Sequence, residues 1–253
     1  MKENAKRAEG IKIRAYEPRD LEQLTKIYKS AFTEQPWNEF MKCMRCGTNY
    51  GKEEVREAST WDSCYTITSR YEEPSTKDKR CKGCGIDLSA ITLTIGGPYI
   101  SKTNQNFVEF WSALDIKEDL QFAESQPSPI ILIAEEKGTL VGFTWGYSLP
   151  LSKFPFLSDG VGKNTAYMDE IAVSPEFRKR GIATQLGKEF LDSSYEVGFS
   201  DVILRTDERN KASMNLFSSL GFAPVTNSGR AVYDPKFPNR VYLKKELAEN
   251  LRV

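Results

Sequence analysis

The chain has 253 residues, 40% of them hydrophobic, which suits one or two globular domains with a buried core and excludes a disordered chain. Lys and Arg total 35 and Asp and Glu total 35, so no net charge draws the protein toward nucleic acid or an anionic membrane. The sequence contains no histidine, which excludes Ser-His and Cys-His catalytic pairs and histidine-based metal motifs.

The amino-terminal residues and the cysteines indicate the compartment. Residues 1–7 are polar and lead directly into a strand-like segment, so we predict no secretory signal. The longest apolar runs, at 130–134 and 140–147, are too short to span a membrane. We therefore expect a cytoplasmic protein, in which four of the five cysteines, arranged as two Cys-x-x-Cys pairs, favour a metal site over disulfides.

The first 35 residues predict a strand followed by a helix. The strand covers 11–15, and an apolar stripe of helical period runs from Leu21 to Phe32 after Pro18. The pattern then breaks into short segments over 36–103, which contain all five cysteines. We interpret this region as an insertion with its own organisation.

Two cysteine motifs lie in this insertion. They read Cys43-Met-Arg-Cys46-Gly47 and Cys81-Lys-Gly-Cys84-Gly85, and 34 residues separate them. Four thiolates in two such tight turns suit a closed tetrahedral zinc site, which stabilises a fold and has no open position for chemistry. The alternative is a set of free or redox-active thiols.

The remaining residues of the insertion give weaker indications. Cys64 has no partner in the pattern, and we expect a small buried side chain rather than a ligand. The near-neutral charge of the insertion weighs against nucleic acid as a partner, although Trp61, Tyr65 and Tyr71 have rings that stack on bases.

After the insertion, strands and helices alternate. We predict an interrupted helix over 104–126, a hairpin of 130–135 and 140–147 around Lys137-Gly138, and a strand over 166–173. A helix follows and ends at Gly198, and the chain closes with a strand at 202–205, a helix at 212–220 and a strand at 241–243. This order predicts an α/β or α+β layered fold.

The turn after the 166–173 strand carries the main binding motif. It reads Arg178-Lys-Arg-Gly181-Ile-Ala183 and opens a helix, whose first backbone N–H groups are unpaired and suit a phosphate. The alternative is a solvated charged turn, because short glycine motifs occur by chance.

Two motifs together resemble those of the GNAT-family N-acetyltransferases. Arg178-x-x-Gly181-x-Ala183 is similar to the family's Gln/Arg-x-x-Gly-x-Gly/Ala signature. Thirty-two residues after Arg178, the segment Asn210-x-x-Ser213-x-x-Leu216-Phe217-x-x-x-Gly221-Phe222 resembles the second cofactor element. The resemblance covers about 128–224 well and 11–35 and 225–246 less closely.

This resemblance implies a mixed central sheet flanked by helices, with a zinc-ribbon-like insertion after the first helix. The acetyltransferase domain would comprise 1–35 and 104–253, and the zinc-binding insertion 36–103. Because the family's acceptor site borders this part of the chain, the insertion would help to shape acceptor binding.

The resemblance also implies a binding mode for acetyl-CoA. Its pantetheine arm would pair with the main chain of Ile171, Ala172 and Val173, whose side chains are equally compatible with core packing. The pyrophosphate would lie on the amides of the turn and first helical residues, with two arginines nearby, and the second motif would contact the thioester half. The residues concerned are Arg178, Lys179, Arg180, Gly181, Ile182, Ala183, Thr184, Asn210, Ser213 and Phe217.

Amine acetylation needs a base, because an alkyl ammonium with a pKa of ~10.4 is almost fully protonated near pH 7. Asp169 and Glu170 lie on the strand that would face the thioester, and strand alternation lets only one of them point into the cleft. We favour Asp169, which shares parity with Ile171 and Val173, and keep Glu170 as the second candidate. Alternatively, both are surface or ion-pair residues.

One position departs from the family. Phe217 stands where the family usually has the tyrosine that protonates the leaving CoA sulfur, and a phenyl ring cannot donate a proton. General acid help is worth ~10²–10⁴ in rate, so its loss need not end catalysis.

We therefore expect an acyltransferase that moves the acetyl group from acetyl-CoA to a primary amine of a small molecule, peptide or protein by direct attack on the thioester. The alternative is a catalytically weak acyl-CoA sensor whose zinc module docks a macromolecule. The sequence leaves open the acceptor, the acyl-chain preference and the oligomeric state, a homodimer included.

Overall fold

The computed structural model describes residues 10–33, 36–56, 59–61, 68–72, 75–88, 91–95, 107–157 and 161–247. The chain divides into two compact units, one formed by Met1–Ala31 and Ile116–Val253 and the other by Phe32–Asp115. We call them the sheet unit and the cysteine unit. Cys64, Tyr65 and the side chains of Trp61 and Tyr71, for which we made sequence predictions, lie outside the described residues.

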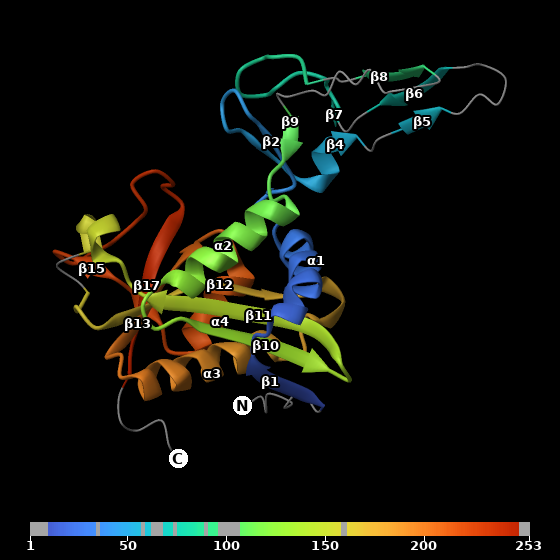
Figure 1. Cartoon of the computed structure of the whole chain (residues 1–253). Helices are drawn as coiled ribbons and strands as arrows, with labels where there is room; N and C mark the ends of the chain where they lie inside the picture. The colour runs from blue at the N-terminus through green and yellow to red at the C-terminus, as the bar shows by residue number, and fades with distance from the viewer. Residues whose placement is uncertain are drawn as a thin grey trace. The chain divides into compact units, whose positions relative to one another are not determined.

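The sheet unit contains a seven-stranded sheet in the order β1-β10-β11-β12-β13-β17-β14 (Figure 1). Every neighbouring pair is antiparallel except β12 and β13, which run parallel. The strands are β1 Ile11–Ala15, β10 Ile130–Glu136, β11 Thr139–Ser148, β12 Thr165–Val173, β13 Asp201–Asp207, β14 Ala223–Pro224 and β17 Arg240–Glu246, with β15 Thr226–Asn227 and β16 Arg230–Ala231 as a separate pair. The mixed α/β architecture predicted from the sequence is confirmed.

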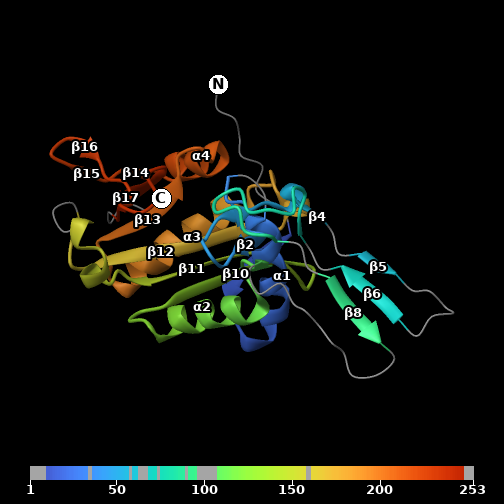
Figure 2. The same cartoon turned by 90° about the horizontal axis from the view of Figure 1, so that it is seen from above.

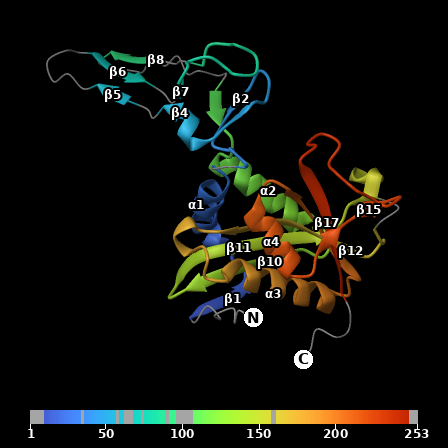
Figure 3. The same cartoon turned by 180° about the vertical axis from the view of Figure 1, so that it is seen from behind.

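Helices cover both faces of this sheet (Figures 1 and 3). Helices α3 (Ile182–Val197) and α4 (Lys211–Ser219) bury Ile182, Leu186, Phe190 and Phe217 in one apolar core against the sheet. On the opposite face, Tyr28 of α1 (Leu21–Phe32) stacks on Phe143 and Trp145, and Phe122 of α2 (Ala113–Ser125) packs edge-on against Tyr147. The sheet therefore has an aromatic face toward α1 and α2 and an aliphatic face toward α3.

Turn and cap signals in the sequence correspond to local geometry. The β10–β11 hairpin turns at Lys137 and Gly138, both with positive φ (50° and 83°), as a tight primed turn requires. Helix α3 ends at Gly198, whose φ of 99° is the left-handed conformation of a glycine C-cap. Both predictions are confirmed.

The predicted helix over 104–126 is wrong in its first part. Residues Phe107–Glu109 form strand β9, which pairs with β2 (Met41–Cys43), and the helix starts only at Ala113. The backbone pairing partner lies more than 60 residues earlier in the chain, so local periodicity gave no sign of it.

The cysteine unit is built from small antiparallel sheets. Strands β3-β2-β9, β4-β7 and β5-β6-β8 form three of them, and Figure 2 shows the last as three adjacent arrows. The remaining bounds are β3 Asn49–Tyr50, β4 Val55–Arg56, β5 Ser59–Trp61, β6 Thr68–Glu72, β7 Ser75–Thr76 and β8 Ile91–Ile95. Two cysteines lie within its small core, which consists of Met41, Cys43, Tyr50, Val55, Cys81, Leu88 and Phe107.

Among the helices that the structure describes, none combines the length and apolar character needed to cross a membrane.

Candidate functional site

The two parallel strands of the sheet separate partway along their length. Their pairing starts at Thr165 with Asp201 and ends at Met168 with Leu204, although β12 continues to Val173 and β13 to Asp207. Beyond Met168, β12 stays paired only with β11 among the described residues. Apart from the Val173 carbonyl, which accepts from Arg178 Nε, the side of Ile171–Val173 away from β11 has no strand partner among the described residues, and an extended ligand can form main-chain hydrogen bonds there.

The predicted phosphate turn lies between this opening and α3. Lys179 and Gly181 both have positive φ (62° and 78°), and Gly181 is the N-cap of α3 without a side-chain hydrogen bond. The amides of Ile182, Ala183 and Thr184 belong to the first helical turn and have no intrahelical acceptor. This geometry concentrates N–H donors and the positive end of the helix dipole, as an anion requires.

The arginines of the turn already have partners. Arg178 Nε donates to the Val173 carbonyl at 3.3 Å, which ties the turn to the end of β12. Arg180 forms a two-point ion pair with Glu136 and lies over the Phe177 ring, while Lys179 is exposed. Of the three cations, Lys179 therefore lacks a recorded partner among the described residues.

The second motif has local structural roles. Asn210 is the N-cap of α4 and its Oδ1 accepts the Ser213 N–H at 3.1 Å, so this asparagine organises the start of the helix. Phe217 is buried and packs edge-on against Phe222 in the aliphatic core. The ring of Phe217 therefore contributes to packing, and it has no hydroxyl group that could donate a proton.

The predicted alternation of the two carboxylates is wrong, because β12 contains a bulge. Trp145 pairs with Glu170 but the next residue, Gly146, pairs with Met168, so Asp169 is an extra residue in β12. Such a bulge shifts the side-chain alternation by one position. Ile171 packs in the aliphatic core, whereas Asp169 and Glu170 both lie on the aromatic face, and the parity argument that favoured Asp169 fails.

Each carboxylate on this face accepts a tyrosine hydroxyl. Tyr147 donates to Asp169 at 2.9 Å, and Tyr28 of α1 donates to Glu170 at 3.2 Å. A third carboxyl group, that of Asp119 on α2, lies near enough to Tyr28 and Asp169 for both to influence its pKa. All three carboxyl-bearing residues are half-buried.

The electrostatics of the cluster follow from burial. Burial and the negative charge of Asp169 raise the pKa of Asp119 to about 7. Burial also raises the pKa of Asp169, against the hydrogen bond from Tyr147 and the positive charge of Arg205, which lower it. Arg205, the first β13 residue past the end of the parallel pairing, is itself ion-paired with Asp234 at 2.5 Å.

One buried donor on this face lacks a hydrogen-bond partner among the described residues. The Nε1 of Trp145, which is completely buried, makes no hydrogen bond within the part of the chain that the structure describes. The same indole is among the groups that lower the pKa of Asp169.

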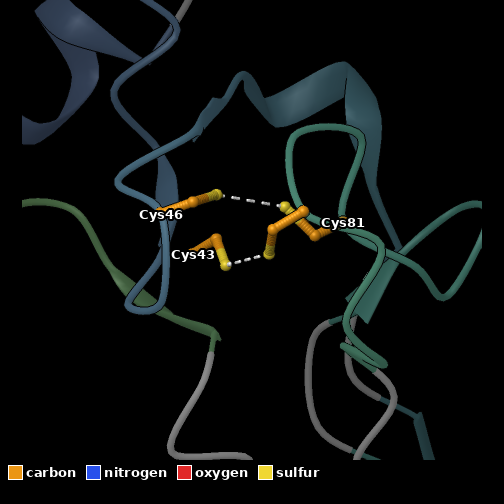
Figure 4. Close-up of side chains that lie close together, drawn as sticks. Cys43, Cys46 and Cys81 are labelled. Carbon is orange, nitrogen blue, oxygen red and sulfur yellow. Dashed lines mark hydrogen bonds between the residues drawn. The ribbon is translucent and has the colours of Figure 1, made fainter.

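The four predicted metal ligands converge in the cysteine unit (Figure 4). The Sγ atoms of Cys43, Cys46, Cys81 and Cys84 all lie within 4.8 Å of one another, and the Cys43–Cys84 and Cys46–Cys81 pairs are 3.8 and 3.5 Å apart. Zn–S bonds of about 2.3 Å in a tetrahedron place sulfurs about 3.8 Å apart. The set therefore has the dimensions of a tetrahedral thiolate site.

The two cysteine turns have the same backbone pattern. Cys43 N donates to Thr48 O and Gly47 N donates to Cys43 O; likewise Cys81 N donates to Ile86 O and Gly85 N donates to Cys81 O. The glycines have φ of 73° and 72°, and nothing lies within 4 Å of where a Cβ would be, so backbone conformation rather than space requires them.

Sequence reasoning missed several residues of the aromatic face. Tyr28 lies on the apolar stripe of the predicted first helix, and Trp145 and Tyr147 lie in the predicted hairpin, so neither pattern indicates a site. Asp119 did carry a signal, because it lies three residues after Ile116 and four before Ala123, on the buried stripe of α2. An acidic residue on an apolar helical stripe indicates a function or a buried partner.

Known proteins with similar sequences are acetyltransferases. Residues 99–222 match the acetyltransferase (GNAT) family model. The mycothiol acetyltransferase of Thermobispora bispora is 32% identical over 116 residues, which are 46% of this chain and 37% of that protein. The thialysine N-epsilon-acetyltransferase of Mus musculus is 32% identical over 106 residues, 42% of this chain and 56% of that protein. The chain thus spans about half or less of the length of these relatives.

Solved structures agree in fold. The PaiA N-acetyltransferase from Thermoplasma acidophilum, in complex with coenzyme A, has a TM-score of 0.51 at 14% identity, with 93% of this chain and 98% of that chain covered. A GNAT-family acetyltransferase from Desulfovibrio desulfuricans has a TM-score of 0.50 at 12% identity, with 94% and 99% covered. The chain therefore has the mixed α/β fold of the GNAT acetyltransferases, and its residues 99–222 are similar to that family's model.

Proposed function

We propose that the protein is an N-acetyltransferase that transfers the acetyl group of acetyl-CoA to a primary amine of a small molecule, peptide or protein. The observation that carries this proposal is the separation of β12 and β13 after Met168 and Leu204, directly beside the donor-rich start of α3. An opened strand edge next to a helix N-terminus suits one extended ligand with a phosphate group. The GNAT family match covers both elements.

In this proposal the chain contributes binding and proton transfer. The amides from Lys179 to Thr184 would hold the pyrophosphate, and the β12 edge from Ile171 to Val173 would pair with the pantetheine arm. Bound there, acetyl-CoA supplies the acyl group. The carboxylates of the aromatic face, Asp169 and Glu170, lie on the same strand, and they are the groups available to take the proton of the amine.

We also propose that the cysteine unit is the zinc-binding insertion. The four sulfurs fit a tetrahedral ion, and Tyr50 supports them by donating to Cys81 Sγ at 3.2 Å while accepting from Lys82 N at 2.8 Å. Zinc would supply fold stability there, since four thiolates leave no open position. On this view 36–103 is a module inserted into an acetyltransferase domain made of 1–35 and 104–253.

Calorimetric titration of the zinc-replete protein with acetyl-CoA tests the cofactor site. Gly181→Glu places a carboxylate at the N-cap of α3, but its φ of 78° strains any side chain there. Gly181→Gln is the matched control, because it has nearly the same size and strain without the charge. We expect wild type and Gly181→Gln to bind and Gly181→Glu to lose binding at least tenfold relative to Gly181→Gln. Equal affinities of the two variants would contradict a pyrophosphate at this position.

The sensor alternative is favoured by one observation, the buried phenyl ring of Phe217 in place of a proton donor. A sensor binds acetyl-CoA without consuming it. Release of free CoA thiol in the presence of a panel of primary amines, above the rate without amine, distinguishes the enzyme from the sensor.

A further inference from the structure

Two side chains of opposite charge border the opening between β12 and β13. The last parallel pair is Met168 with Leu204, so the next residue is Asp169 on β12 and Arg205 on β13. Opposite charges on neighbouring strands ordinarily attract one another directly. Here the structure records no ion pair between Asp169 and Arg205, and each has a different partner.

Both side chains lie on the aromatic face of the sheet. Asp169 accepts the hydroxyl of Tyr147 at 2.9 Å. Arg205 is directly opposite Tyr242 in the ladder of β13 and β17, and residues directly opposite one another share a face. Successive ring contacts connect the two positions, through Tyr147, Tyr167, Phe154 and Tyr242. The carboxylate and the guanidinium therefore border the opening on the same face.

Their hydrogen-bond partners hold the two charges on opposite sides of the opening. Tyr147 belongs to β11, which pairs with β12 on the side away from β13. Arg205 Nη1 donates to Asp234 Oδ2 at 2.5 Å, and the N–H of Asp234 donates to Arg240 O at the start of β17, on the side of β13 away from β12. The carboxylate is thus anchored toward β11 and the guanidinium toward β17, which explains why they do not meet.

Arg205 is fixed in place and still has donors without a recorded acceptor. Its partner Asp234 is itself held by three further donors, Lys236 N, Phe237 N and the Tyr242 hydroxyl. A guanidinium has five N–H groups, and for Arg205 the structure records one hydrogen bond to a described residue. The side chain is 28% exposed, so the core does not enclose it. A fixed guanidinium with unused N–H groups suits two-point binding of a carboxylate.

We propose that the acceptor is a free amino acid, whose carboxylate binds Arg205 and whose amine lies toward Asp169. This inference rests on the proposed acetyl transfer and narrows its acceptor from primary amines in general to this one class. A zwitterion supplies one charge for each of the two groups. A simple alkyl amine, or the amino end of a peptide, has no carboxylate beside its amine and would leave the guanidinium without a counterion.

The variants must separate carboxylate binding from the other role of Arg205, which is to hold the loop before β17 through Asp234. Arg205→Lys keeps a positive charge beside the buried Asp234 and removes the planar fork. Arg205→Gln removes both, and it leaves Asp234 without its counterion, which can prevent folding. Arg230→Gln, at an exposed position on β16, is the control for the loss of one positive charge.

The experiment observes the guanidinium itself. Uniformly ¹⁵N-labelled, zinc-replete protein is titrated by NMR at pH 6.5, below the pKa of about 8 of an α-amino group. The probes are L-alanine, L-leucine and L-lysine, each compared with its carboxamide, in which a neutral amide replaces the carboxylate. The Nε–H resonance of Arg205 is the one missing in Arg205→Lys, and amide resonances of β13 report binding in the variants.

We expect at least one of these amino acids to move the Arg205 resonance saturably and to bind wild type at least tenfold more tightly than its carboxamide does. The ratio of the two affinities should fall at least threefold in Arg205→Lys, fall to about one in Arg205→Gln, and stay unchanged in Arg230→Gln. Where Arg205→Gln does not fold, Arg205→Lys decides. The proposal is overturned if no amino acid binds more tightly than its carboxamide, or if the ratio is unchanged in Arg205→Lys.

This result is separable from the proposed function. If amino acids bind at Arg205 but no amine releases CoA from acetyl-CoA, the carboxylate site stands and acetyl transfer fails. If amines release CoA with no preference for a carboxylate, transfer stands and the role of Arg205 is refuted. Where both hold, Arg205→Lys should raise the KM of the amino acid and leave kcat/KM of its carboxamide unchanged, a selective loss that a purely structural residue would not cause.

Discussion

Replacing Asp119 by Asn should make the sheet unit more stable at alkaline pH. Burial and Asp169 raise the pKa of Asp119 to about 7, from an ordinary value of 3.8. Between these two pH values the unfolded chain has lost the proton and the folded chain keeps it, so folding stability falls as pH rises through this window. Asn keeps the shape of the protonated acid and does not titrate.

The magnitude follows from the shift. The pKa of Asp119 differs by about 3 units between the folded and the unfolded chain, and each unit is worth 1.36 kcal/mol. The free energy of unfolding of Asp119→Asn should therefore exceed that of wild type by about 4 kcal/mol at pH 8 and by almost nothing below pH 4. The partial exposure of Asp119 makes this an upper value.

The assay must report on the sheet unit alone, because three of the four tryptophans, Trp37, Trp61 and Trp111, belong to the cysteine unit. Urea unfolding with pulsed hydrogen exchange, followed on peptides from β12 and β13, meets this condition. Asp119→Asn should have a higher urea midpoint than wild type at pH 8 and an equal one at pH 4. The control Glu118→Gln, at an exposed neighbouring position on α2, should match wild type at both pH values. A difference that does not change with pH would refute the reasoning.

Three further predictions concern other parts of the chain. Cys84→Ser should no longer bind zinc stoichiometrically in metal analysis, and the amides of β2 and β9 should lose their protection from hydrogen exchange. The control is Met44→Ser, at an exposed position between two ligands, which should retain both the zinc and the protection. Tyr50→Phe should lower the zinc affinity about 10- to 100-fold in a chelator competition, because it removes the hydroxyl that donates to Cys81 Sγ. An unchanged affinity would show that this hydrogen bond does not support the ligand. Gly146→Ala should lower the free energy of unfolding measured in urea by more than about 3 kcal/mol, because its Cβ would lie 2.1 Å from Tyr167 O in the pairing of β11 with β12. The control Gly138→Ala has nothing within 4 Å of its Cβ and should lose only about 1–2 kcal/mol through backbone strain.

Features fixed by local chemistry could be predicted from the sequence. The cysteine turns, the Lys137-Gly138 hairpin and the Gly198 helix end each depend on a few adjacent residues whose conformational preferences are strong. The strand, helix and strand around Gly198 were also predictable, because the hydrophobic period changes at each of their boundaries.

Features that depend on contacts between distant segments could not be predicted from the sequence. The bulge at Asp169 arises where β12 meets Trp145 and Gly146 of β11, and strand alternation in the isolated segment gave the wrong face. The pKa of Asp119 depends on Tyr28 from α1 and Asp169 from β12, which are 91 and 50 residues away in the sequence. No pattern within one element indicates such a meeting of three elements.

The pairing of β2 with β9 has a consequence for chain entropy. Phe110 N donates to Phe40 O at 3.0 Å, so the chain enters and leaves the intervening 41–109 segment at one place. By the (3/2)RT ln n relation, the entropic free energy of closing an unstructured loop of that length is about 4 kcal/mol greater than that of a one-residue connection. With β2 and β9 paired, the strand β1 is joined to its partner β10 by an effectively short connection. An ion held by the cysteines would thus favour β1–β10 pairing without touching either strand, and replacing 41–109 by a tight turn should preserve that pairing.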